Sequence, residues 1–318
     1  MNTVVVANPA ASAGRVLARW PRIEALLREV FGPLETQFTS GPGQATSMAR
    51  NALRSGAERI VAVGGDGTNN EVVNGFFDPD SGTAIAPGAV LATYPVGTGG
   101  DFVRSIGLSG KDAALRFHQM TTRTIDVGHA ELIGPFGEPV HRFFLNISSF
   151  GSSGLIVEKV NRTSKRLGGK AAFLWGTLKG LFVYRNQKIE LRIDDVYART
   201  LPINTVAVAN GRYFGGSMKI APQALLNDGL FDVTIVGDVG LLTFLRYSSA
   251  IYAGTHIGRA GVESVRGKKV TATPCGKEPV LIDLDGEQPG RLPVTYEIVP
   301  KALVVEAPWQ FAEGVSAG

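Results

Sequence analysis

The segment Gly64–Thr68, with the sequence Gly-Gly-Asp-Gly-Thr, constrains the fold of this chain more than any other stretch. It follows an apolar run, Arg59–Val63, and precedes Asn69–Phe76, whose pattern favours a helix. A strand, a glycine loop and a helix in this order let a backbone approach phosphate, because glycines leave N–H groups uncovered and the helix dipole attracts anions. Asp66 would repel a phosphate unless a cation lay between them. The loop therefore predicts a nucleotide bound with Mg²⁺.

A tight hairpin turn at Asp66 and Gly67 is the competing interpretation, because Asp-Gly is a common turn dipeptide. The residues that follow show neither the alternation nor the β-branched density of a strand, which favours the helix. The loop lacks the Gly-Lys-Ser/Thr of a Walker A motif and the spaced glycines of a dinucleotide fold.

The first part of the chain alternates between strand and helix patterns, as in a mostly parallel sheet covered by helices. The expected strands are Val4–Ala7, Leu34–Thr39, Arg59–Val63 and Val90–Tyr94. The expected helices are Arg15–Val30 with a kink or restart at Pro21, Ala45–Leu53, the segment after the glycine loop, and Asp112–Met120.

From about Ile125 onward strand patterns dominate, interrupted by two helical insertions near 154–184 and 240–254. The expected strands are Phe143–Ile147, Lys188–Ile193, Asn204–Ala209, Phe231–Val236, Lys269–Thr273, Val280–Leu284 and Val294–Val299. We expect an α/β nucleotide-binding domain over residues 1–127. A β-rich, sandwich-like substrate domain should cover 128–318, and its extreme C-terminus is free to pack back on the first domain.

Two further glycine-bearing loops follow expected strands, Asn8–Gly14 with Arg15 just after it, and Pro95–Asp101. Ligands of open α/β sheets bind beyond the carboxyl ends of the strands, so the three loops should share one rim. For the first loop, a plain turn with a surface arginine is the alternative.

Seven motifs in order along the chain resemble those of the diacylglycerol kinase catalytic domain family, and most closely its soluble bacterial lipid kinases. The motifs are Asn8–Gly14, Gly64–Thr68 with Asn70–Gly75, Pro95–Phe102, Thr124–Gly128, Asn210–Gly216, Ala221–Leu230 and Asp285–Glu287. The resemblance implies an NAD-kinase-like two-domain architecture. It also implies a lipid kinase that uses ATP and Mg²⁺ to phosphorylate a lipid hydroxyl in a cleft between the domains.

The resemblance also implies roles for individual residues. Asp66 lies near the ATP phosphates and the catalytic metal, and Asp101 and Asp126 match two carboxylates gathered around metal-bound water. Glu287 matches the general base. The implied nucleotide contacts are Asn8, Gly14, Arg15, Thr39, Gly64, Gly65, Gly67, Thr68, Asn69, Asn70 and Thr98.

A second, structural Mg²⁺ site is implied at Asp228, with the carbonyls of Leu225 and Leu230 as further ligands. Read without the family, Asn-Asp-Gly is simply a strong turn. The sequence departs from the family at Gly100, where asparagine is usual, and at Asn227, where some relatives carry aspartate. Arg15 replaces a common lysine, and the two cations differ in geometry.

Charge and hydropathy bear on the partners. The net charge is +4, which weakly favours anionic partners, and no basic-aromatic patch points to nucleic acid. If 155–170 is helical, Lys159, Arg162, Arg166 and Lys170 share one side, which suits either an anionic membrane surface or plain solvent. The apolar stretches 171–184 and 240–254 could line an acyl pocket or cover the β domain. With one cysteine and no signal-peptide pattern, we expect a cytoplasmic protein that touches membranes peripherally.

Two other functions remain open at this stage. An NAD kinase shares Gly-Gly-Asp-Gly-Thr, although its usual Asn-Glu motif in the second domain is not recognisable here. A non-catalytic nucleotide-binding regulator is the other. The acceptor lipid and the oligomeric state, including a homodimer, are left undecided.

Overall fold

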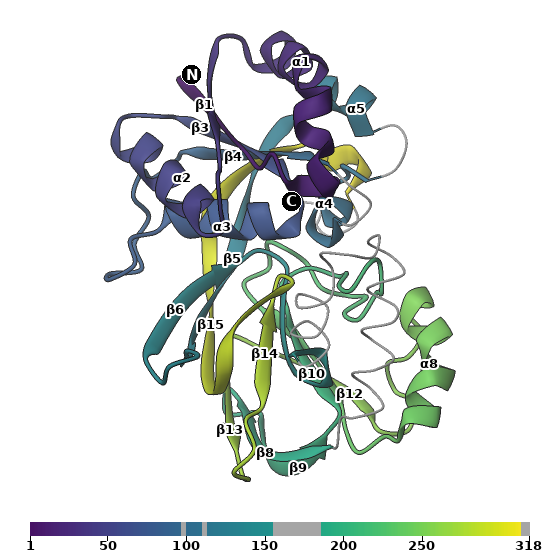
Figure 1. Cartoon of the computed structure of the whole chain (residues 1–318). Helices are drawn as coiled ribbons and strands as arrows, with labels where there is room; N and C mark the ends of the chain where they lie inside the picture. The colour runs from purple at the N-terminus through teal and green to yellow at the C-terminus, as the bar shows by residue number, and fades with distance from the viewer. Residues whose placement is uncertain (97–99, 110–112, 155–185, 313–318) are drawn as a thin grey trace.

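The computed structural model describes residues 1–96, 100–109, 113–154 and 186–312. Figure 1 shows an upper half in which helices pack around a sheet and a lower half built mostly of strands. Two long strands, β5 (Thr121–Ile133) and β15 (Glu287–Ala307), pair antiparallel and run through both halves. The two halves are therefore joined by continuous sheet.

The upper half is a parallel sheet flanked by helices. Its strands are hydrogen-bonded in the order β2 (Leu34–Phe38), β1 (Thr3–Ala7), β3 (Arg59–Gly64) and β4 (Val90–Pro95). The end of β15 adds a fifth parallel strand, with Val304 beside Val90. The flanking helices are α1 (Ala11–Phe31), α2 (Gln44–Arg54), α3 (Asp66–Phe76), α4 (Asp101–Ser105), α5 (Ala113–Arg116) and the 3-10 turn η1 (Phe117–Gln119).

Apolar residues recur at helical spacing on α1 to α3, and this is why these helices pack on the sheet. Leu27 of α1, Ala49 of α2 and Val72 of α3 are fully buried in one core with the β1 and β3 strands. These strands consist almost entirely of buried residues, as expected for parallel strands covered on both faces.

The lower half is a sandwich of two strand groups that share β15. One group runs β12–β11–β10–β7–β14–β15, and the other contains β9–β8–β13 and β6–β5. Ile189 of β8 and Val206 of β10 lie in the same buried core, so the two groups face each other. The bounds are β6 (Pro139–Phe144), β7 (Ile147–Gly151), β8 (Gln187–Ile193), β9 (Tyr197–Ile203), β10 (Thr205–Ala209), β11 (Phe231–Val236), β12 (Val262–Gly267), β13 (Lys269–Pro274) and β14 (Leu281–Leu284).

Two shorter elements complete the described fold, the helix α8 (Leu241–Ala253) and the 3-10 turn η2 (Trp309–Phe311). The predicted fold class is confirmed, and so is the helix predicted near 240–254. The insertion predicted at 154–184 lies almost wholly outside the described residues. Within the part of the chain that is described, no helix combines the length and the apolar character needed to cross a membrane.

Three local predictions were wrong. Helix α1 continues through Pro21, and its non-helical residues are instead Ser12, Ala13 and Gly14. The predicted strand Phe143–Ile147 is split, because β6 ends at Phe144 and β7 begins at Ile147. The segment predicted as one helix from Asp112 is the single turn α5 followed by η1.

Strand β15 is much longer than the predicted segment Val294–Val299. Pro293 and Pro300 flank that segment and interrupt the strand pattern in the sequence. In the structure, the pairing of β15 with β5 shifts register at the same two places. A proline can remain in a strand where the ladder is irregular, because its missing N–H is not needed there.

Candidate active site

The glycine loop after β3 presents uncovered backbone N–H groups. Strand β3 ends at Gly64, and α3 begins at Asp66 after an extended Gly65 that offers no side-chain cap. The first N–H groups of a helix have no partner within the helix, and the dipole makes this end electropositive. The predicted strand, loop and helix are thus confirmed, and the geometry suits an anion.

Side-chain hydrogen bonds join this loop and the start of α3 to the loop after β1 and to strand β4. A Cβ on Gly64 would collide with the Thr68 side chain, so only glycine lets α3 approach the end of β3 this closely. The Thr68 hydroxyl in turn accepts a hydrogen bond of 3.3 Å from Asn8 Nδ2, from the loop after β1. Asn69 accepts one of 2.7 Å from Thr93 of β4. The hydrogen bonds of Asn8, Thr68 and Asn69 thus stabilise the arrangement of these segments at the carboxyl ends of the strands.

The loop after β1 turns sharply before helix α1 becomes regular. Ser12, Ala13 and Gly14 all have left-handed backbone conformations, with φ of 54°, 60° and 80°. Successive N–H groups in such turns form concavities that bind anions. Arg15 follows directly and is exposed, so its guanidinium is available to a ligand at this loop.

Asp66 carries an unpaired oxygen. Its Oδ2 accepts a hydrogen bond of 3.1 Å from the backbone N–H of Asp101, whereas its Oδ1 is buried without a partner among the described residues. Burial, together with the charge of Asp101, raises the pKa of Asp66 to about 7. A cation near Oδ1 would satisfy this oxygen and favour the ionised form.

Asp101 stands at the start of α4 and reaches the lower half. Its carboxylate accepts hydrogen bonds from the backbone N–H groups of Gly216 and Ser217, at 2.9 and 2.7 Å. Burial raises its pKa. Gly100, which precedes it, has a φ of 122°, a conformation that side-chain-bearing residues rarely adopt. The departure from the family at position 100 is thus compatible with the backbone here.

The Asp285–Glu287 segment is the turn between β14 and β15. Asp285 and Gly286 have φ of 50° and 89° and close the turn. The Asp285 carboxylate accepts backbone hydrogen bonds from Leu145 and Ile147, both 2.9 Å, and one of 3.2 Å from Asn70 of α3. These bonds occupy the N–H groups that a continuous strand would use, which is why the predicted strand at 143–147 is split.

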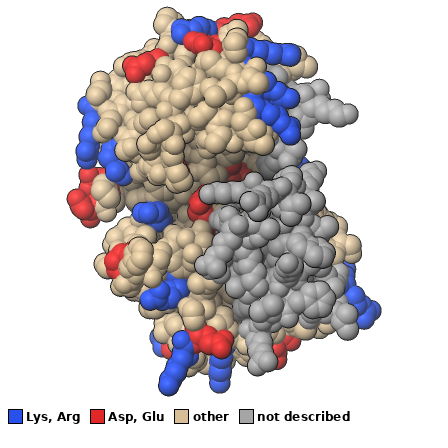
Figure 2. All heavy atoms as spheres, viewed as in Figure 1, with Lys and Arg blue, Asp and Glu red and all other residues tan. Residues whose placement is uncertain are grey.

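Glu287 lies against the first turn of α3. A Cβ on Gly67 would lie 2.8 Å from Glu287 Oε1, so this carboxylate sits directly over the glycine loop. Desolvation raises the pKa of Glu287, and the charge of Glu71 adds to the effect. The structure therefore brings Asp66, Asp101 and Glu287 to the junction of the two halves. Figure 2 shows acidic atoms in the narrow waist between these halves.

Asp126 lies in a second cluster with the loop at 225–230. Its two oxygens accept hydrogen bonds from the N–H groups of Lys301 (2.7 Å) and Gly229 (2.6 Å), and the residue is fully buried. Its own N–H donates to the Leu226 carbonyl at 2.6 Å. Burial raises the pKa of Asp126, against the effect of the two N–H donors.

Asp228 stands beside Asp126 and forms an ion pair with Arg266. Its Oδ1 also accepts a hydrogen bond of 3.2 Å from the N–H of Leu230. The arginine already supplies positive charge where the resemblance implies Mg²⁺ with the carbonyls of Leu225 and Leu230. That metal role stays a prediction.

The remaining predictions concern Thr39, Thr98 and a basic segment. Thr39 is buried just after β2, where its N–H donates to the Ala7 carbonyl at 2.9 Å. Thr98 and the basic segment with Lys159, Arg162, Arg166 and Lys170 lie outside the described residues.

Sequence reasoning assigned no role to Glu71, which caps helix α2. Its carboxylate accepts hydrogen bonds from the N–H groups of Gly43 (2.8 Å) and Ala45 (3.0 Å). The signal was present: α2 starts after Gly43 without a capping side chain of its own, so its free N–H groups needed an acceptor from elsewhere. Asp285 was likewise seen only as part of a motif, although it joins the two halves.

The comparisons with known proteins agree with the two-domain fold. Residues 2–130 match the diacylglycerol kinase catalytic domain, and 146–307 match the YegS C-terminal NAD kinase beta sandwich-like domain. The chain is similar to a diacylglycerol kinase of Bacillus subtilis, 29% identical over 282 residues and 87% of each chain. It is also similar to a probable YegS-like lipid kinase of Pseudomonas aeruginosa, 30% identical over 306 residues, covering 89% of this chain and 88% of that protein.

A solved structure shares the fold. The crystal structure of a putative diacylglycerol kinase from Bacillus anthracis superposes with a TM-score of 0.72 at 23% identity, over 96% of each chain. The two matching domain families and the relatives named as kinases imply a phosphotransferase. This chain belongs to the family of bacterial diacylglycerol kinases and YegS-like lipid kinases.

Proposed function

We propose that this protein transfers the γ-phosphate of ATP to the hydroxyl of a lipid, with Mg²⁺ at Asp66 and Glu287 as general base. The observation that carries the proposal is the position of Glu287 directly over Gly67, in the first turn of the helix that would receive the phosphates. A base and a phosphate site within one side-chain length of each other are what a transfer to an alcohol requires.

The residues present fit Mg-ATP. The uncapped start of α3 and the left-handed residues Ser12 and Ala13 offer backbone N–H groups to phosphate oxygens, whereas the Gly14 N–H already donates to the Ala10 carbonyl at 3.3 Å. Asp66 Oδ1 is buried and has no partner among the described residues, as a hard-metal ligand would be before the metal binds. When bound, Mg²⁺ would neutralise charge that develops on the transferring phosphoryl group. Asp101 fixes the other oxygen of Asp66 through its N–H.

Glu287 would accept the proton of the acceptor hydroxyl. An alcohol is too weak an acid for a carboxylate to ionise beforehand, but in a loose phosphoryl-transfer transition state the proton can leave late. Desolvation raises the pKa of Glu287, and this makes it a stronger base than a free glutamate. Asp285 holds the turn that presents Glu287, since it is bonded to both halves.

The acceptor we propose is diacylglycerol or a related lipid, because relatives over most of the chain are named diacylglycerol kinase and lipid kinase. A lipid acceptor requires peripheral contact with a membrane surface. A non-catalytic regulator is the second candidate, and it would bind ATP without transferring phosphate to any lipid. The intact carboxylates at Asp66 and Glu287 favour the kinase.

The test uses radiolabelled ATP, Mg²⁺ and a panel of lipids that contains diacylglycerol, phosphatidylglycerol and a sphingoid base. We expect the Glu287→Gln variant to lose roughly 10²–10⁴-fold in kcat, the range for a general base, while ATP affinity is kept. Glu278→Gln is the matched control, because Glu278 is exposed just before β14. Near-normal turnover by a folded Glu287→Gln protein would show that Glu287 is not the general base. Absence of label in every lipid would favour the regulator.

A further inference from the structure

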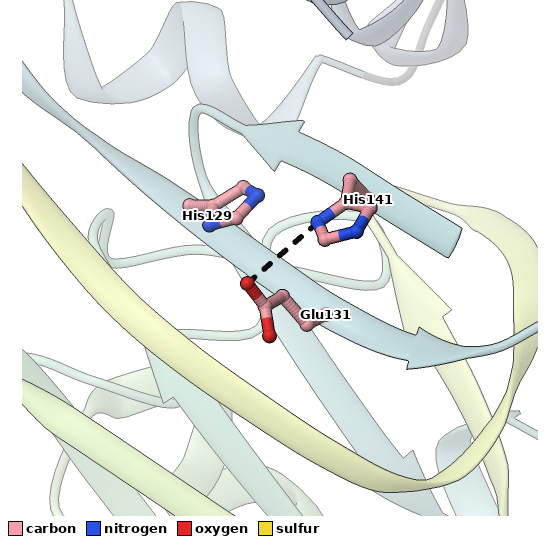
Figure 3. Close-up of side chains that lie close together, drawn as sticks. All are labelled: His129, Glu131 and His141. Atoms are coloured by element: carbon pink, nitrogen blue, oxygen red, sulfur yellow. Dashed lines mark ion pairs between the residues drawn. The ribbon is translucent and has the colours of Figure 1, made fainter. Parts of the chain in front are cut away.

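The hairpin of β5 and β6 carries a cluster of two histidines and a glutamate. His129 and Glu131 lie two residues apart on β5, and therefore on the same face of the strand. Strand β6 pairs with β5 so that His141 lies directly opposite Glu131, and His129 lies opposite Phe143. Figure 3 shows the three side chains on one side of the hairpin, converging on the space between them.

The ligand atoms are close together. One potential metal-binding atom from each of the three residues lies within 4.8 Å of the other two. His141 Nδ1 is 3.7 Å from Glu131 Oε1, and the two imidazole rings are stacked with centroids 5.6 Å apart. We propose that His129, Glu131 and His141 bind a divalent transition metal of the Zn²⁺ type, separate from the Mg²⁺ of the phosphate site.

The ligand chemistry favours such a metal. Two imidazoles and one carboxylate are a common zinc set, whereas Mg²⁺ prefers oxygen ligands alone. Tetrahedral Zn²⁺ with bonds of about 2.0–2.2 Å places its ligand atoms roughly 3.4 Å apart, so the side chains must close in by ~1 Å. Glu131 and His141 are exposed and free to make that movement. Three protein ligands leave the fourth position to water.

One ligand is already fixed. His129 is partly buried, and its ring packs on Phe143 with centroids 4.8 Å apart. On the other side, Glu297 of β15 lies opposite His129, but its carboxylate is paired with Lys269 at 2.6 Å. Glu297 thus adds negative potential without occupying the space between the three ligands.

A metal at this site would cross-link strands β5 and β6 next to the upper half of the molecule. The backbone N–H of Phe143 donates to Asn74 of α3 at 2.9 Å, and its ring stacks on Phe77 at 4.1 Å. A metal that joins β5 to β6 therefore stiffens a hairpin already docked on the helix that begins at Asp66. Because the metal would bind the folded hairpin and not the unfolded chain, it should stabilise the protein.

The test is calorimetric titration of the full chain, without a histidine tag, with ZnCl₂ in the presence of millimolar MgCl₂. We expect one saturable site and a rise in Tm on binding. His141→Ala should weaken binding by at least about 10–100-fold, the loss that even outer-shell substitutions cause. His118→Ala should leave binding unchanged, because His118 lies 4.0 Å from Glu29 but has no third potential ligand among the described residues.

A second measurement separates ligand loss from misfolding. Co²⁺ in place of Zn²⁺ should give the visible absorption of a four- or five-coordinate site in the native protein and in His118→Ala, and not in His129→Ala or His141→Ala. Unchanged circular dichroism of these variants would show that they fold. Displacement of Zn²⁺ by Mg²⁺, or equal Zn²⁺ binding by the native protein and the folded His141→Ala variant, would overturn the proposal.

Discussion

Asp66 at the start of α3 and Asp126 on β5 are two carboxylates near the junction of the halves, but their oxygens are satisfied differently. Asp66 has one oxygen bonded to a backbone N–H and one buried oxygen with no partner among the described residues. Asp126 has both oxygens bonded to backbone N–H groups.

This difference distinguishes the carboxylate of Asp66, which is available to a ligand, from that of Asp126, which stabilises the fold. A buried oxygen without a partner costs stability, so its presence next to the glycine loop fits the proposal that a bound ion completes it. A carboxylate with two backbone donors is already complete, and its removal should be felt in folding. The comparison predicts opposite phenotypes for the two aspartates.

The largest expected effect is on catalysis at Asp66. Asp66→Asn keeps an acceptor for the Asp101 N–H but loses the anionic oxygen that would hold Mg²⁺. We expect kcat to fall by roughly 10³-fold, comparable to removal of one transition-state-stabilising group. Lipid kinase assays over a range of Mg²⁺ concentrations measure this. Full activity at saturating Mg²⁺ would mean that Asp66 is not a metal ligand.

The second effect is on the stability of Asp126→Ala. The backbone N–H groups of Gly229 and Lys301 would lose the carboxylate that accepts from them, and a hydrogen bond to a charged group contributes about 1.5–3 kcal/mol. We expect the free energy of unfolding in urea to fall by about 2–4 kcal/mol. Asp80→Ala, at an exposed aspartate, should change it by less than about 0.5 kcal/mol. If Asp126→Ala lost turnover at unchanged stability, Asp126 would belong with Asp66.

The third effect is a pH-dependent stabilisation by Asp66→Asn. The folded protein holds a proton on Asp66 up to a pKa of about 7, whereas the unfolded chain releases it near pH 4. Stability of the native protein therefore falls between these two values as the pH rises, and the asparagine variant lacks that loss. Urea unfolding without Mg²⁺ should show the variant gaining on the order of 2 kcal/mol between pH 5 and 8. A constant difference would contradict the raised pKa.

The smallest effect tests the approach of Glu287 to the loop. A methyl group in Gly67→Ala would push the Glu287 carboxylate away, since the added Cβ would lie 2.8 Å from its Oε1. We expect kcat to fall by roughly 10-fold through misplacement of the base, with stability unchanged or raised, because alanine favours helix. Gly276→Ala, whose Cβ would meet nothing within 4 Å, is the control. Unchanged turnover in Gly67→Ala would show that this position of Glu287 is not required.

Most of the upper half was predictable because its signals are local. The patterns of buried strands such as β1 and β3 lie in consecutive residues, and their predicted bounds were correct to within one residue. The helix after the glycine loop was also predicted, but it begins at Asp66, three residues before the predicted start at Asn69. The errors fell where a distant group intervened. The split at Leu145 exists because its N–H donates to Asp285, which lies in the turn between β14 and β15. No residue between 143 and 147 indicates that partner.

The sequence alone determined the kind of chemistry. It showed which segments carry glycine loops and which residues are acidic. It also showed that the loops and their acidic residues follow strands whose ends share one edge of the sheet. Only the tertiary structure decided which carboxylates meet. Asn70 donates a hydrogen bond to Asp285 although the two residues are 215 positions apart. The turn that contains Asp285 also places Glu287 over Gly67. The structure also placed Asp126 with Asp228 and joined two histidines with Glu131. Residue type and order follow from the chain, but proximity depends on strand pairing and register, which are set by long-range packing.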